Sequence, residues 1–105
     1  MELTSKQRAW LRAQANGLDV ILYVGLDGVN DGVVRQADEA LTAREMIKGT
    51  VQENAPVTAR EASELLAERT GAQGVQVIGR RFVLYRENPD PQNRKYTLPV
   101  QGKRK

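Results

Sequence analysis

Two short stretches of this sequence have residue types that can bind a phosphate group. The first is a pair of glycines, Gly25 and Gly28, which encloses Leu26 and Asp27. The pair lies between an apolar run and a helix-forming stretch, where backbone N–H groups can face an anion. A tight turn with positive φ at a glycine is the structural alternative. The spacing matches neither a dinucleotide-binding fingerprint nor a P-loop.

The second stretch is a basic turn. Arg80 and Arg81 follow Gly79, and Arg86 is close in sequence. Guanidinium groups on a hairpin can form forked hydrogen bonds to phosphate oxygens. An exposed turn whose charges discourage strand pairing would have the same residues. Both interpretations stay open at this point.

Positive charge is concentrated at the C-terminal end. Residues 79–105 contain eight basic and two acidic residues, a net charge of +6, whereas residues 1–78 contain eight basic and eleven acidic residues, a net charge of −3. This asymmetry favours a polyanionic partner, although a solubilising tail would also produce it. Besides the glycine loop, the candidate contacts to such a partner are basic: Lys6, Arg8, Arg12, Arg80, Arg81, Arg86, Arg94 and Lys95.

The composition removes most catalytic chemistry. There is no cysteine and no histidine, so thiol nucleophiles, Ser-His-Asp triads and the usual metal ligands are missing. We therefore expect no enzyme activity, no metal site and no cofactor. The carboxylates are interpreted as solvated, because no histidine partner or metal-ligand spacing accompanies them; they are Asp38, Glu39, Glu45, Glu61, Glu64 and Glu68.

Length and hydropathy predict one globular domain. The chain has 105 residues, of which 40% are apolar and 28% are charged, as in ordinary single domains. The N-terminal residues lack the pattern of a signal peptide, and no run of 18 apolar residues occurs. The expectation is a cytoplasmic monomer without membrane contact.

Capping patterns and apolar periodicity predict three helices. Thr4 and Gln7 form a capping box before a helix over residues 6–15. A second helix runs from residue 30 or 31 to about residue 44, and Thr58 with Glu61 opens a third helix that ends at Gly71. The residues expected to face the core are Leu3, Trp10, Leu11, Ala13 and Ala15 near the first helix, and Val33, Val34, Ala37, Ala40 and Leu41 in the second.

Four strands are predicted between and after these helices. Residues 19–24 indicate a strand buried on both faces, as in a parallel sheet, and residues 46–51 form a second strand. Residues 75–78 and 82–85 flank a hairpin turn. The resulting class is α/β, of the two-layer α+β type, with the order α-β-α-β-α-β-β and right-handed crossovers. Residues 88–105 contain three prolines and little apolar sequence, which predicts a flexible basic tail.

The aromatic residues do not predict a base-stacking platform. Trp10, Tyr23, Phe82 and Tyr85 all lie in apolar patterns, so core packing is expected for each, whereas Tyr96 has no assignment. The aromatic RNA-binding pattern of an RRM is missing, which argues against RNA recognition on the face of the sheet.

Taken together, six segments resemble the bacterial YhbY proteins, which are stand-alone CRM domains. They occur in the expected order and cover about residues 2–87. They are residues 3–8 (LTSKQR), 24–29 (VGLDGV), 38–41 (DEAL), 44–48 (REMIK), 59–62 (AREA) and 75–86 (VQVIGRRFVLYR). The resemblance implies a CRM-like domain over residues 1–87, followed by the tail. It also implies a mixed four-stranded sheet with three helices, similar to the C-terminal domain of translation initiation factor three.

The same resemblance implies a function in RNA binding without catalysis. The RNA would be a precursor of the large ribosomal subunit in bacteria, and the protein would assist the assembly of that subunit. The family's loop usually reads Gly-Lys-x-Gly, whereas this chain has Leu26 and the acidic Asp27 between the glycines. The alternative is a protein-binding adaptor that docks through its acidic helices on a ribosomal protein or another factor.

Overall fold

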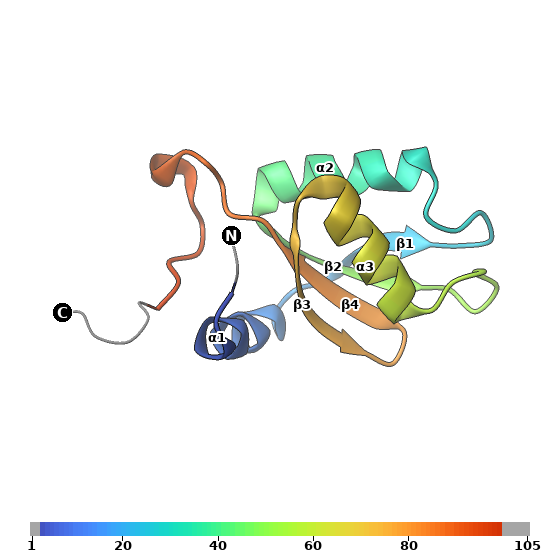
Figure 1. Ribbon diagram of the computed structural model, residues 1–105, viewed down its shortest axis with the longest axis horizontal. Coiled ribbons are helices and arrows are strands. Elements are labelled where there is room, and N and C mark those ends of the chain that lie inside the picture. Colours follow the sequence, from blue (N-terminus) through green and yellow to red (C-terminus); the bar gives the residue numbers. More distant parts are fainter. Residues whose placement is uncertain (1–2, 100–105) are drawn as a thin grey trace.

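The computed structural model describes residues 3–99, and its elements follow the expected order (Figure 1). They are α1 (Ser5–Ala15), β1 (Val20–Val24), α2 (Asp31–Arg44), β2 (Met46–Val51), α3 (Ala59–Thr70), β3 (Gln73–Ile78), β4 (Arg81–Tyr85) and the short 3₁₀ helix η1 (Pro91–Asn93). The predicted α-β-α-β-α-β-β order and the mixed four-stranded sheet are therefore confirmed.

Local sequence explains where α1 and α3 begin. The Thr4 hydroxyl accepts a hydrogen bond from the Gln7 amide at 3.0 Å, and the Gln7 side chain accepts one from the Thr4 amide at 3.1 Å. Thr58 and Glu61 form the same reciprocal pair at α3. These bonds satisfy amides that have no partner inside a helix. Helix α3 ends at Gly71, whose φ of 74° is the left-handed conformation that glycine adopts without strain.

The sheet has the strand order β1-β2-β4-β3, and this order corrects the prediction for β1. Strand β1 is parallel to β2, as expected, but it lies at an edge. Leu22 and Val24 are buried, whereas the side chain between them, Tyr23, is 54% exposed. The central strands are β2 and β4, because β4 inserts between β2 and β3. A continuous apolar run does not reveal such an insertion.

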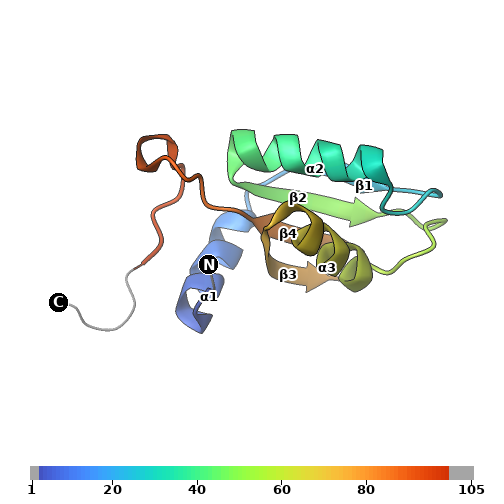
Figure 2. The ribbon, with the colours of Figure 1, turned by 45° about the horizontal axis from the view of Figure 1, so that its top comes forward.

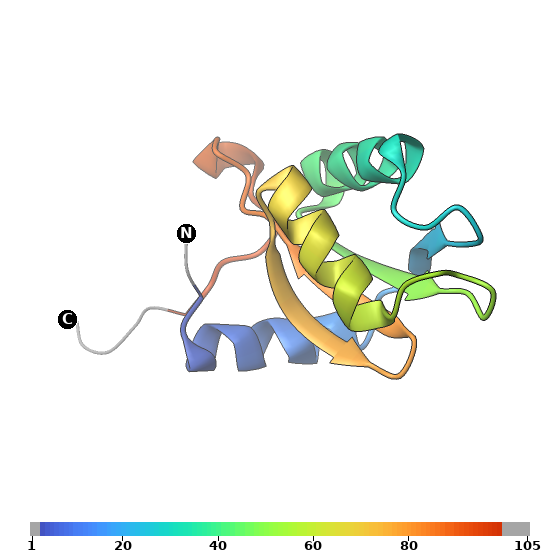
Figure 3. The ribbon, with the colours of Figure 1, turned by 45° about the vertical axis from the view of Figure 1, so that its right-hand side comes forward.

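Helices α2 and α3 cover one face of the sheet together and enclose the larger core (Figures 1 and 3). Leu41 and Leu66 of these helices are buried in the same cluster as Phe82 and Ile47 of the sheet. The Phe82 ring lies so close to Gly49 that a Cβ on this glycine would come within 2.4 Å of the ring. Gly49 is therefore part of the packing of this face.

Helix α1 lies on the opposite face, over one end of the sheet only (Figures 2 and 3). Leu11 is fully buried there with Met46, Val83 and Tyr85. Ala13, which was expected to face the core, is exposed. A single helix turns only part of its surface toward a sheet, and Leu11 and Ala15 occupy that part.

Residues 88–99 cross the end of the sheet beside α1, held by the carboxylate of Glu45. Glu45 Oε2 accepts a hydrogen bond from the Asn88 amide at 2.6 Å, and Oε1 accepts from the Lys95 and Tyr96 amides at 2.5 and 3.1 Å. Glu45 is only 1% exposed and has a φ of 66°, so its interpretation as a solvated carboxylate was wrong. Backbone donors from a segment fifty residues away satisfy the buried charge.

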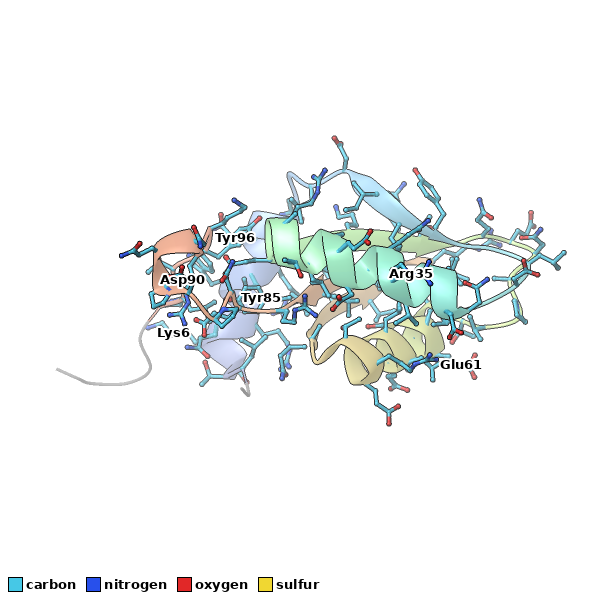
Figure 4. The ribbon with its side chains drawn as sticks, turned by 90° about the horizontal axis from the view of Figure 1, so that it is seen from above. Lys6, Arg35, Glu61, Tyr85, Asp90 and Tyr96 are labelled. Carbon is cyan, nitrogen blue, oxygen red and sulfur yellow. The ribbon has the colours of Figure 1, made fainter. Side chains whose placement is uncertain are left out.

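Aromatic packing also holds this segment in place. The Tyr96 ring meets Trp10 and Tyr85 edge to face, each at a centroid distance of 6.4 Å, and Tyr85 and Tyr96 lie at the same end of the molecule in Figure 4. Leu98 joins the same cluster. Residues 88–99 therefore pack on the domain, in contrast to the predicted flexible tail. The division at residue 87 stays a prediction, and residues 100–105 lie outside the described part.

Candidate nucleic-acid interface

The glycine loop after β1 is a closed turn. The Gly28 amide donates to the Gly25 carbonyl at 2.9 Å, and Gly28 has a φ of 67°. A Cβ on Gly25 would lie 2.6 Å from Gln52 Oε1, and one on Gly28 would lie 3.1 Å from the Pro56 ring. The two glycines thus allow the loop to pack against the β2–α3 loop. The Gly28 N–H is used within the turn and does not point free toward a ligand.

Charge at this end of the molecule is mixed and partly acidic. The tip of the glycine loop consists of Leu26, which is 70% exposed, and Asp27, which is also exposed. Arg80, in the neighbouring hairpin turn, lies 3.9 Å from the Glu53 carboxylate. The tip itself presents no cation to a phosphate.

A more favourable surface lies on the sheet face opposite α2 and α3, beyond the end that α1 covers. The backbone pairing places Tyr23, Thr50, Arg81 and Ile78 side by side across all four strands. One row behind them, Val20, Lys48, Val83 and Gln76 are aligned in the same way. Val83 is buried beneath α1, and we call the other seven residues the open sheet face.

The open sheet face combines positive charge with exposed apolar groups. Arg81 is exposed and Lys48 is half-buried, and none of the seven residues is acidic. Tyr23 is 54% exposed at one edge, and Ile78 is 64% exposed at the other. The hollow lined by Lys48, Arg81 and Ile78 has a volume of about 150 Å³, smaller than the roughly 300 Å³ of a small-molecule pocket. The surface is suited to an extended polyanion.

The other basic residues that were predicted as contacts do not form one continuous patch with the open sheet face. Lys6 is exposed on α1, Arg12 is half-buried in its last turn, and Arg8 donates through Nε to the Gly74 carbonyl at 3.2 Å. Arg94 lies 3.5 Å from the Glu87 carboxylate, and the backbone of Lys95 is held by Glu45. Of the adjacent pair Arg80 and Arg81, only Arg81 belongs to the open sheet face.

The guanidinium of Arg86 is held by hydrogen bonds within the domain. Its Nη1 donates to Asp38 Oδ1 at 2.6 Å and to the Thr70 carbonyl at 2.7 Å, while Nη2 donates to the Asp38 carbonyl and the Thr42 hydroxyl. The guanidinium thereby ties the end of β4 to α2 and to the end of α3. Four such bonds leave little of the group for a phosphate.

Sequence reasoning missed Tyr23 and Lys48 as surface residues. Lys48 and Thr50 alternate in β2 with Ile47, Gly49 and Val51, and this period of two already indicates one solvated face. Tyr23 gave no such indication because apolar residues surround it on both sides. Its ring is exposed because it lies on the uncovered part of the sheet face opposite α2 and α3, in one row with Arg81.

No other chemistry is evident in the part of the chain that the structure describes. Within residues 3–99 there is no group of three or more acidic residues that could hold a metal ion, and none of the helices there has the length and apolar character to cross a membrane. Burial raises the pKa of Tyr85 to about 12, and burial together with Glu45 raises the pKa of Tyr96. Both hydroxyls are therefore protonated at neutral pH. They lie at the end of the molecule that α1 covers.

Comparison with known proteins identifies a family for this arrangement. Residues 3–86 match the CRS1 / YhbY (CRM) domain. The probable RNA-binding protein YqeI of Bacillus subtilis is 41% identical over 97 residues, covering 92% of this chain and 99% of YqeI. An RNA-binding protein of Haemophilus influenzae is 31% identical over 88 residues, covering 84% of this chain and 89% of that protein.

A solved structure agrees with the fold. The solution structure of a hypothetical protein from Staphylococcus aureus superimposes with a TM-score of 0.78 at 39% sequence identity. The match covers 93% of this chain and all of that chain. The mixed sheet with three helices is thus shared with a homologue of nearly the same length.

Proposed function

This chain belongs to the CRS1/YhbY (CRM) domain family, and on that premise we propose that it binds RNA and catalyses no reaction on it. Its relatives are named as RNA-binding proteins, and this supports RNA as the ligand. The finer part of the proposal is that the RNA is ribosomal RNA or its precursor, bound by a cytoplasmic monomer that assists assembly of the large ribosomal subunit. The resemblance to the YhbY proteins over residues 2–87 supports this part.

The open sheet face is the observation that carries the proposal. Lys48 and Arg81 belong to the open sheet face, none of whose own residues is acidic, whereas the glycine loop has Asp27 at its tip. Contacts between such cations and phosphates release counterions, so affinity should fall with salt and depend little on sequence. We therefore assign the main phosphate contacts to the sheet.

The test is RNA binding by gel shift across a salt series with two matched double variants. Lys48→Gln with Arg81→Gln removes two cations from the open sheet face. Arg35→Gln with Arg60→Gln removes two exposed cations, one from α2 and one from α3; Arg35 is labelled on α2 in Figure 4. The sheet variant should bind more weakly and lower the salt slope by roughly 0.7 per lost contact with a single strand. The helix variant should bind like wild type.

Other results would contradict the assignment of the interface to the sheet, or the proposal of RNA binding itself. Equal binding by both variants would place the RNA elsewhere, and wild-type binding that ignores salt would favour the protein-binding adaptor. The ribosomal part needs crosslinking in cells followed by sequencing of the attached RNA. Recovery of large-subunit ribosomal RNA is expected, whereas mostly messenger or transfer RNA would contradict this part.

A further inference from the structure

Tyr23 differs from the other aromatic side chains of the described chain. Tyr96 packs edge to face on Trp10 and on Tyr85, and Phe82 is buried against Gly49. Tyr23 instead stands on the open sheet face with more than half of its side chain exposed. Its hydroxyl donates to the Val20 carbonyl of the same strand at 3.4 Å, the one polar contact recorded for this side chain. The ring is thus available to a ligand.

The residues paired with Tyr23 suit the backbone of a nucleic acid. Thr50 lies beside it on β2, and Arg81 follows on β4. Neighbouring strands are about 4.8 Å apart, which puts Arg81 roughly 10 Å from Tyr23 along the row. Lys48 stands two residues before Thr50 on β2, about 7 Å along the strand. A base on the ring of Tyr23 would therefore have cations on one side of it, across the sheet.

Acidic residues in the loops limit the path that an RNA strand can take across the sheet. Asp27 and Glu53 are exposed in the two loops that follow β1 and β2. Their negative charges repel phosphate at the loop end of the sheet, beyond the row that contains Tyr23 and Arg81. The favourable path runs across the strands, from Tyr23 toward Arg81 and Ile78. Ile78 adds an exposed apolar side chain at the far edge.

We infer that the open sheet face binds an unpaired RNA segment, with one base stacked on Tyr23 and the adjoining phosphates held by Lys48 and Arg81. This inference rests on the proposed RNA-binding function and names the form of RNA that the site takes. A base in a duplex has both faces covered by its neighbours, so only an unpaired base can offer a face to the ring. Aromatic stacking combined with cations along the backbone is the general mode of single-strand binding.

The experiment compares a single-stranded oligoadenylate of 12 nucleotides with a blunt-ended RNA duplex of 12 base pairs. Tyr23→Thr removes the ring and introduces a β-branched residue, which suits a strand. Ile78→Thr is the matched control, since it makes the same replacement at the exposed far end of the same row. Tyr23→Phe retains the stacking surface and removes only the hydroxyl. Melting curves report on folding of each variant.

Tyr23→Thr should weaken oligoadenylate binding by roughly 5- to 150-fold, the usual effect of losing one stacked base, and should leave duplex binding within twofold. Tyr23→Phe should bind like wild type, and Ile78→Thr should lose less than Tyr23→Thr. An equal loss for both RNAs, or no loss for either, would overturn the inference. Self-association that Tyr23→Thr abolishes without any change in RNA binding would also overturn it. Failure of the wild type to bind either RNA would instead refute the proposed function.

Discussion

Removing the Glu45 carboxylate tests how the C-terminal segment is attached to the domain. Three backbone amides, those of Asn88, Lys95 and Tyr96, donate to its two oxygens. Hydrogen bonds to a charged group contribute about 1.5–3 kcal/mol each when buried. The three amides are only partly buried and act together, so we expect Glu45→Ala to lower the free energy of unfolding by about 2–4 kcal/mol.

Comparison with glycine separates the carboxylate from the backbone. Glu45 has a φ of 66°, which costs a residue with a side chain energy that glycine avoids. Glu45→Gly should therefore be less destabilising than Glu45→Ala by about 1 kcal/mol, yet less stable than wild type. Glu45→Gln should lie between wild type and alanine, because its amide nitrogen replaces one acceptor with a donor.

Urea denaturation measures these differences, and amide hydrogen exchange localises them. In Glu45→Ala the amides of Asn88, Lys95 and Tyr96 should exchange faster, while those of the central strand β4 keep their ranking. A loss of 2–4 kcal/mol lowers the melting temperature by about 10–20 °C in a domain of this size. Unchanged stability with full protection of the three amides would refute the role assigned to the carboxylate.

Three further perturbations have defined outcomes. Leu26→Lys with Asp27→Gly should tighten RNA binding and steepen its salt slope by roughly 0.7–0.9; an unchanged slope would place the glycine loop outside the interface. Gly49→Ala should cost about 1–3 kcal/mol in urea denaturation, because the new methyl overlaps the Phe82 ring, and a wild-type midpoint would contradict this packing. Tyr85→Phe should reduce the stability loss between pH 10 and pH 12, since burial, followed by nearby carboxylates, raises the Tyr85 pKa to about 12 while the tyrosine of the unfolded chain ionises near 10. It should also raise stability at pH 8, because the buried hydroxyl has no hydrogen-bond partner in the described structure, and a less stable phenylalanine variant would contradict that.

Helix boundaries were predictable because their causes are local. The capping boxes at Thr4 and Thr58 and the left-handed Gly71 each involve contacts within a few residues. The hairpin between β3 and β4 was predictable for the same reason. The burial of Glu45 was not, because its hydrogen-bond donors come from residues 88–96 and only the completed fold brings them together.

For the candidate site, the sequence indicates which residues are charged but not which of them the fold leaves free. Arg81 was a candidate from its charge, and the structure places it on the open sheet face. Arg86 had the same charge, but its partners Asp38 and Thr70 are distant in sequence and occupy the guanidinium. Charge alone does not separate a cation that binds a ligand from one that joins two helices to a strand.

The open sheet face itself follows from the topology. Strands β1, β2 and β3 are mutually parallel, and the chain steps across the sheet in one direction from each to the next. Right-handed crossovers that step in one direction place their helices on the same face, where α2 and α3 are found. The opposite face is left to α1 and to residues 88–99, which together cover only the end near Met46 and Tyr85. The end near Tyr23 and Arg81 stays uncovered, so polar and aromatic side chains there do not serve the core, and their chemistry is free for a ligand.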